Sequence, residues 1–158
     1  MCSSDLEPQA LEVEPLNRSP SRIWMASGHP LTERSELTLQ ECARHPLVVL
    51  EADRVEVLLH GLWAQRGLHP TVLIRSTSLE AVRSLVGVGA GIALLPDFLY
   101  RPWTLDAEHV EARELTDEIP TIDVGLVWRR GTPSRPLTNE FIELIREQSR
   151  SLRSRQLF

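Results

Sequence analysis

The middle of the chain alternates between short apolar runs and apolar residues at helical spacing. The run at 47–50 is apolar throughout, which is typical of a strand buried on both faces of a parallel sheet. From Asp53 to Trp63 apolar residues recur every three or four positions, and Gly67 follows where the predicted helix ends. The β-branched and apolar residues 71–74 predict the next strand. This part of the chain therefore predicts a strand, a helix and a second strand.

The same pattern repeats directly downstream. Thr77 and Glu80 have capping-box spacing, in which two side chains satisfy free amides at the start of a helix. The apolar residues of this helix lie on one stripe, at Leu79, Val82, Leu85 and Val86. The glycine-rich segment 87–91 ends the helix, and the run 92–95 predicts a third buried strand. Strands and helices alternating at this spacing predict an α/β fold with parallel strands and right-handed βαβ crossovers.

Weaker signals lie upstream of these repeats. The segments 10–16 and 23–26 predict two short strands, with turn-forming residues at 17–21 between them. The segment 38–41 has capping-box spacing from Thr to Glu, and the short helix that it starts must end before Pro46.

Downstream of the repeats, residues 96–103 predict a turn with a short irregular helix, and 110–115 and 122–128 predict two further strands. A closing amphipathic helix follows Pro136. We expect a frayed tail at 151–158, because little apolar content remains there.

The composition is that of an average soluble globular protein. Of 158 residues, 42% are hydrophobic and 25% are charged, which fits one ordinary domain or two small lobes. The net charge of −5 has the wrong sign for a phosphate-binding face, so we expect no nucleic-acid contact from this segment. No apolar run is long enough to span a membrane, and Cys2 and Cys42 make no disulfide framework, so a cytoplasmic protein is expected. Every basic residue is arginine, which suggests a GC-rich, bacterial coding sequence.

The first six residues stand apart from this pattern. Residues 2–6 can be back-translated as TGC-TCT-TCC-GAT-CTN, which matches a common sequencing-adapter end. We expect residues 1–6 to be either an assembly artefact, with the natural protein extending further upstream, or a short disordered tail.

The chain offers few residues for catalysis or metal binding. Cys42 and His45 stand three apart, as two metal ligands or a thiol and its base could, but Pro46 ends the helix that would align them. The other histidines are scattered, and no Gly-x-Ser-x-Gly motif is present. The glycines of 87–91 follow a helix and precede a strand, the reverse of a dinucleotide-binding fingerprint, so they predict a tight turn. We expect no enzyme activity, no bound metal and no cofactor.

Two strand-to-helix junctions remain as candidate binding positions. In α/β sheets, small ligands bind at the carboxyl ends of strands, where helix N-termini present free amides and positive partial charge. Glu51 and Arg54 mark the first junction, and Arg54 could pair with a carboxylate or be an ordinary surface residue. Ser76, Thr77 and Ser78 mark the second. Their hydroxyls suit a carboxylate or another small anion, but helix capping also explains them.

Several of these segments together resemble the effector-binding domain of LysR-type transcriptional regulators. In chain order they are HPL at 29–31, PL at 46–47, SLEAV at 78–82, LV at 85–86, GAGIALLP at 89–96 and GLVWRRG at 125–131. The resemblance covers roughly residues 12–148, and no single segment is diagnostic alone. It implies the type 2 periplasmic-binding-protein fold, in which two α/β lobes joined by two crossing strands hold an inducer between them.

The resemblance also implies how the chain is divided. Residues 37–118 would be the complete second lobe, and 7–36 with 119–150 would be the last strands and closing helix of a partial first lobe. The winged helix-turn-helix, its linker helix and the opening part of the first lobe are missing. DNA would therefore be bound only through a domain absent from this chain. Leu95 and Pro96, at the end of the Leu-Leu-Pro strand, join the expected effector-binding residues.

The function implied by the resemblance is the sensing of a small molecule, with a carboxylate as the expected chemical class. The full-length regulator would be a homo-oligomer, a dimer or tetramer, whose DNA-bound form the inducer shifts by population shift and not by catalysis. Two alternatives share the fold. A solute-binding protein of a transporter would be favoured by an upstream signal peptide, and an enzyme would require a reactive group in the cleft.

Overall fold

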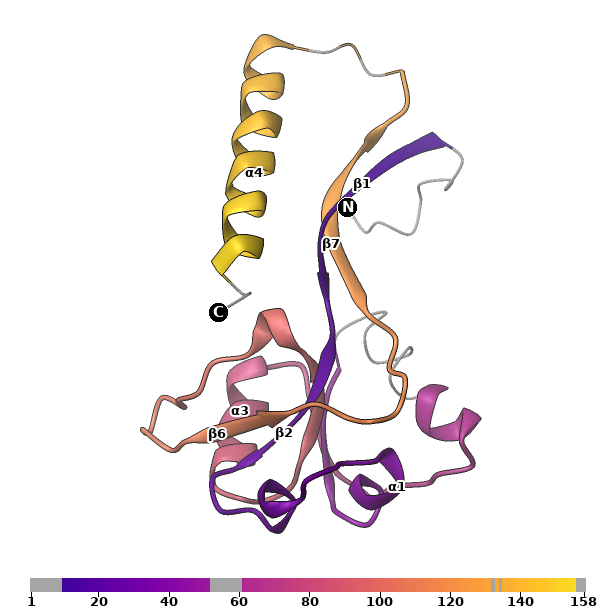
Figure 1. Cartoon of the computed structure of the whole chain (residues 1–158), viewed down its shortest axis with the longest axis vertical. Coiled ribbons are helices and arrows are strands. Elements are labelled where there is room, and N and C mark those ends of the chain that lie inside the picture. The colour runs from indigo at the N-terminus through magenta and orange to yellow at the C-terminus, as the bar shows by residue number, and fades with distance from the viewer. Residues whose placement is uncertain (1–9, 52–60, 132, 134, 156–158) are drawn as a thin grey trace. The chain divides into compact units, whose positions relative to one another are not determined.

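The computed structural model describes residues 10–51, 61–131, 133 and 135–155, with side chains described as far as residue 150 (Figure 1). The chain divides into a smaller unit, Met1–Arg18 with Asp123–Phe158, and a larger unit, Ser19–Ile122. This division differs from the expected one. Residues 19–36, assigned above to the first lobe, belong to the larger unit.

Strand β2 (Ser21–Ala26) accounts for that difference, because it is the middle strand of a sheet in the larger unit. Strands β5 (Ala93–Pro96) and β6 (Val110–Arg113) pair with it on either side, and both pairings are antiparallel. The consecutive residues 23–25 of β2 are all 0% exposed. Burial of consecutive side chains means burial of both faces, because neighbouring residues in a strand point to opposite sides.

The two repeats predicted from the sequence form the parallel part of this unit. Strand β3 (Leu47–Leu50) pairs parallel with β4 (Val72–Ser76), as predicted. Leu47 also forms a parallel bridge with Ile92, directly before β5, and the Val48 amide donates to the Ile92 carbonyl at 2.8 Å. The strands therefore follow one another in the order β4, β3, β5, β2, β6, and the first three run in the same direction.

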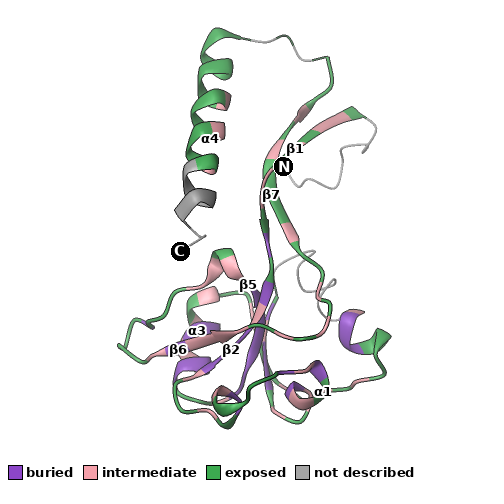
Figure 2. Cartoon of the chain, viewed as in Figure 1, coloured by how far each residue is buried: buried purple, intermediate pink, exposed green. Residues whose placement is uncertain are grey.

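Helices cover these strands and complete two apolar clusters. Figure 2 shows buried residues on β2, β5 and α3. Helix α3 (Leu79–Gly87) buries Val82 and Val86 against a cluster that contains Trp24 of β2. The second cluster brings Met25 of β2 together with residues from α1 (Leu39–Cys42) and from the helical residues 61–65.

Most of the helix expected from Asp53 onward, residues 52–60, lies outside the described residues. Its end is described. Gly67 has a φ of +66°, and the Leu68 amide donates to the Trp63 carbonyl at 2.9 Å. A glycine at positive φ is the usual end of a helix, so the predicted end is confirmed.

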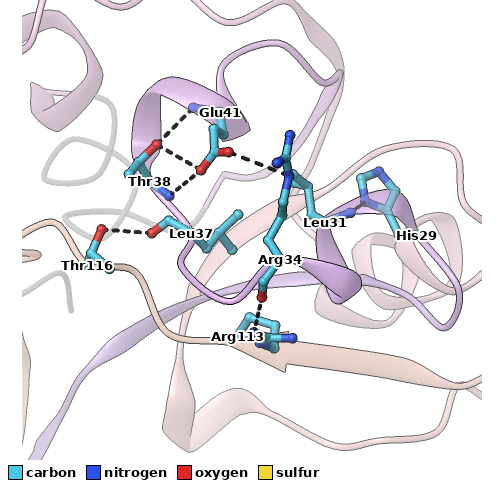
Figure 3. A network of polar contacts seen from close by, with 8 residues as sticks. All are labelled: His29, Leu31, Arg34, Leu37, Thr38, Glu41, Arg113 and Thr116. Carbon is cyan, nitrogen blue, oxygen red and sulfur yellow. Dashed lines mark hydrogen bonds and ion pairs between the residues drawn. The ribbon is translucent and has the colours of Figure 1, made fainter.

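A polar network holds the segment between β2 and β3 (Figure 3). The segment begins with the 3₁₀ turn η3 (Pro30–Glu33). The Thr38 hydroxyl accepts from the Glu41 amide at 3.2 Å, and the Glu41 carboxylate accepts from the Thr38 amide at 3.1 Å, which confirms this predicted capping box. Arg113 of β6 donates to the Arg34 carbonyl at 2.7 Å. This connection is therefore fixed to the sheet by hydrogen bonds.

One expectation about the outer segments is wrong. Strand β1 spans Leu11–Ser19, so the supposed turn residues 17–19 continue a strand, and only Pro20 separates it from β2. Proline is compatible with an extended backbone, and its missing N–H interrupts the ladder at one residue. Helix α4 spans Pro136–Arg155, so the described part of the expected frayed tail is helical.

The smaller unit combines β1, β7 (Ile122–Arg129) and α4. Strands β1 and β7 are antiparallel, because the Arg130 amide donates to the Ala10 carbonyl at one end and Arg18 pairs with Asp123 at the other. Two hydrogen bonds of 2.7 and 2.5 Å from Arg146 to the Glu14 carboxylate tie α4 to β1 and lower the pKa of Glu14. None of the described helices is long and apolar enough to cross a membrane.

The close approach of β3 and β5 gives a test of this packing. A Cβ at Gly91 would lie 2.6 Å from the Pro46 carbonyl oxygen, which accepts the Ile92 amide at 2.9 Å. We expect Gly91→Ala to lower the free energy of unfolding by about 1–3 kcal/mol, measured by denaturant titration. The control Gly61→Ala lies in a helix with nothing within 4 Å of the added Cβ, and should be neutral or stabilising by up to about 1 kcal/mol. Equal effects of the two substitutions would contradict this packing.

Exposed apolar side chains of the smaller unit predict self-association. Val13 is 67% exposed on β1, and Leu137 and Phe141, one turn apart on α4, are 78% and 57% exposed. Contiguous apolar surface and open sheet edges promote association. We expect the 158-residue chain to form oligomers whose mass, measured by light scattering, rises with protein concentration. The substitutions Leu137→Gln and Phe141→Gln should reduce this association. A monodisperse monomer that unfolds cooperatively would refute this prediction.

Candidate functional site

Three strands of the larger unit end at one side of the sheet. Strands β3, β4 and β5 run in the same direction, so their carboxyl ends, at Glu51, Ser76 and Pro96, lie along one edge. We call this the carboxyl edge and include Thr77 and Ser78, which follow Ser76. In α/β sheets this is the edge where small ligands bind. The structure therefore places Glu51 and the junction at Ser76–Ser78 on the side of the sheet where ligands are expected.

The junction at Ser76–Ser78 is built from hydroxyl groups and the start of α3. Ser78 is the N-cap, and its Oγ accepts from the Ala81 amide at 3.3 Å. The Oγ of Ser76 accepts from the Ser78 amide at 3.1 Å. Both serine hydroxyls thus accept backbone hydrogen bonds and keep a proton to donate. Thr77 and Ser78 are exposed, so these groups face solvent.

The expected capping box at this helix is wrong. The sequence spacing paired Thr77 with Glu80, but the helix begins one residue later, with Ser78 as its cap. Glu80 instead forms an ion pair with Arg83, and this interaction lowers the pKa of Glu80. Thr77 is therefore not the cap that stabilises α3, and Ser78 is.

The two junctions meet through backbone pairing. Leu50 lies opposite Ser76, and the Glu51 amide donates to the Ser76 carbonyl at 2.8 Å. The Glu51 side chain is exposed at the same edge. Arg54, the other residue expected there, lies outside the described residues. The described part of the first junction therefore contributes an acceptor, the Glu51 carboxylate.

The side chains at the end of β5 pack in the core and present no polar group at the carboxyl edge. Leu95 is 2% exposed and packs in the apolar cluster around Trp24, so its side chain faces the core. Pro96 is also buried. The turn that follows, η4 (Asp97–Leu99), is held by the Ser19 hydroxyl, which accepts from the Phe98 amide at 3.0 Å. The role of Ser19 was not predicted from the sequence. The only sequence feature that could have indicated it is the position of this serine directly before Pro20, which interrupts the strand.

The described residues contain no group of three or more His, Cys, Asp or Glu side chains that could hold a metal ion. The rings of His29 and His45 lie 4.7 Å apart between centroids, and burial together with the charge of His45 lowers the pKa of His29. Two imidazoles do not make up the four ligands of a structural zinc site. Cys42 does not complete such a site, because its side chain is 0% exposed in the core.

Comparison with known proteins relates the chain to one family. The model of the LysR substrate binding domain matches residues 2–150. The hydrogen peroxide-inducible genes activator of Pectobacterium carotovorum subsp. carotovorum is 29% identical over 142 residues, covering 89% of this chain and 47% of that protein. The DNA-binding transcriptional dual regulator OxyR of Escherichia coli K12 is 29% identical over 141 residues, covering 89% and 46%. The chain thus spans less than half the length of these relatives.

Solved structures agree on the fold. HinK, a LysR family transcriptional regulator from Pseudomonas aeruginosa, superposes with a TM-score of 0.81 at 24% identity, covering 92% of this chain and 50% of that one. The effector binding domain of QuiR in complex with shikimate gives a TM-score of 0.72 at 18% identity, covering 91% and 68%. The expected α/β fold of effector-binding domains is confirmed.

The environment of Cys42 predicts an inert thiol. Burial, followed by the charges of Glu41 and Asp117, raises the pKa of Cys42 to about 12. The thiolate is the reactive form, so Cys42 should resist iodoacetamide and hydrogen peroxide in the folded protein and react once denaturant is added. Mass spectrometry of a Cys2→Ser variant isolates this thiol. Rapid labelling of the native variant would show that the thiol is reachable and would contradict the prediction.

Proposed function

Because the chain belongs to the LysR substrate-binding domain family, we propose that it is the sensing part of a transcription regulator and binds a small effector at its carboxyl edge. The observation that carries this proposal is the convergence there of Glu51, three hydroxyl residues and the N-terminus of α3. Such an edge offers hydrogen bonds to a small polar molecule without any reactive group for catalysis.

The chemistry of the edge favours a small organic acid that also carries hydroxyl groups. The hydroxyls of residues 76–78 and the positive end of α3 suit a carboxylate. Glu51, in contrast, repels an anion and accepts hydrogen bonds, so it suits a hydroxyl of the same ligand. Shikimate, named in the QuiR structure, is an acid of this kind, and the regulatory domain of Synechocystis CcmR was solved with 2-PG. These two structures support a small acid as the class of effector.

We further propose how the sensor acts in the complete regulator. The relatives named above are transcriptional regulators more than twice as long as the match, which favours a regulator over a solute-binding protein. DNA contact would come from a domain outside this chain, since the net charge here is −5. The effector would act in the cytoplasm, by shifting a homo-oligomer between two populations.

The name of the Pectobacterium relative refers to hydrogen peroxide, but the described part of this chain does not support a cysteine that responds to it. A peroxide-sensing cysteine needs thiolate character and exposure. Cys42 has neither, since it is buried and its pKa is raised to about 12. Cys2 lies outside the described residues.

Substitutions at the junction separate effector binding from helix capping. In the full-length protein, we expect Thr77→Ala and Ser78→Ala to weaken the response to organic acids by one to two orders of magnitude, because loss of a hydrogen bond to a charged group costs about 1.5–3 kcal/mol. Only Ser78→Ala should also lower the free energy of unfolding, by about 1 kcal/mol, because Ser78 is the cap. Calorimetric titration of a panel that begins with shikimate, and denaturant midpoints of the same samples, measure the two effects.

Thr38→Ala is the matched control for this experiment. Thr38 caps α1, which precedes β3 and lies away from the carboxyl edge. Its loss should reduce stability like the loss of Ser78 but leave the effector response unchanged. If the Thr77 and Ser78 variants keep the wild-type response, the junction only caps a helix and the binding assignment is wrong.

A further inference from the structure

Arg83 is a buried charge that the proposed function does not use. It lies on α3 between Val82 and Val86, and it is 2% exposed. Arginine is almost never buried to this extent unless its charge is paired.

The guanidinium of Arg83 contacts two segments that are separate in sequence. It pairs through Nη1 with Glu80 in the first turn of α3. Through Nη2 it donates to the Leu99 carbonyl at 3.0 Å, in the turn η4. One planar group therefore bridges the start of a helix and a turn whose accepting carbonyl, that of Leu99, lies sixteen residues after Arg83.

A third contact fixes the position of this bridge over the sheet. The Arg83 Cζ lies 5.8 Å from the centroid of the Trp24 ring, a cation–π distance. Trp24 is 0% exposed on β2, and its ring lies edge-on to Tyr100 at 5.5 Å. The Tyr100 hydroxyl donates to the Val110 carbonyl at 2.8 Å. The guanidinium thus rests on a ring that neighbouring side chains hold in place.

The two bridged segments both begin at the carboxyl edge. Helix α3 starts at Leu79, directly after Ser78, and η4 starts at Asp97, directly after Pro96. We propose that Arg83 is a positioning residue that holds these two ends in one fixed arrangement at the effector site. The link to an effector site rests on the proposed function. The positioning of the two segments by Arg83 can be tested without an effector.

Stability alone does not explain an arginine at this place. Glu80 is 49% exposed, so replacing Arg83 by an apolar residue of similar volume leaves no buried charge without a partner. A residue that only filled the core could therefore be methionine. Arginine differs because its rigid planar fork donates from two separate nitrogen atoms, whereas lysine carries all its donors on one nitrogen atom.

Amide hydrogen exchange of the full-length protein tests this positioning. Two amides report on the bridged ends, Val82, which donates to Ser78, and Tyr100, which donates to Asp97. The Val48 amide, which donates to Ile92 within the sheet, reports on the rest of the unit. In Arg83→Met we expect both reporters at the ends to exchange at least about tenfold faster while Val48 is unchanged, because local opening is separate from global unfolding.

Two further variants distinguish a bridge from a general role of the charge. Arg83→Lys keeps the charge and should restore slow exchange at no more than one of the two ends. Glu80→Ala removes only the contact within α3 and should speed exchange at Val82 but not at Tyr100. Both variants also keep the test valid if Arg83→Met fails to fold.

Three outcomes would overturn the proposal. They are unchanged exchange at Tyr100 in Arg83→Met, equal acceleration at Val48, or full restoration of both ends by lysine. None of them depends on effector binding, so failure here is distinct from failure of the Thr77 and Ser78 experiment.

Discussion

The burial of β2 on both faces is the constraint on which the larger unit depends. Ile23 and Met25 belong to one apolar cluster and Trp24 to the other, and all three are 0% exposed. Side chains that alternate between two cores need helices on both sides and strands on both edges. Because β5 pairs with β2 and also borders β3, this central strand determines where the carboxyl ends of β3, β4 and β5 come together.

The sequence predicted the parallel repeats because each of their signals is local. The run 47–50, the capping box that begins at Thr38 and the glycine at 67 each depend on a few neighbouring residues, and the structure confirms all three. The position of β2 could not be predicted in this way. Its antiparallel partners lie more than 60 residues downstream, and an apolar run does not indicate direction.

The candidate site was predicted in part. Glu51 and Ser76 meet through strand register, and that meeting follows from the parallel pairing that the repeats imply. The choice of cap at α3 did not follow, because Thr77 and Ser78 are both suitable hydroxyl residues and only the backbone geometry decides between them. Leu95 was predicted to contact the effector, but its side chain is 2% exposed and faces the core. The apolar run that ends at the edge also fills the core, and its sequence does not separate these two roles.

The division between core and edge explains how such a site can change its ligand without losing its fold. Thr77 and Glu51 are exposed, whereas the side chains that determine the sheet lie in the two clusters below them. Substitution of exposed residues usually changes stability by less than about 0.5 kcal/mol. Thr77 and Glu51 can therefore vary at little cost in stability, whereas Ser78 also caps α3, provided that the backbone which presents them stays in place. Arg83 is the buried residue that we propose to meet this requirement, because its contacts with Glu80 and Leu99 join the two segments that begin at the edge.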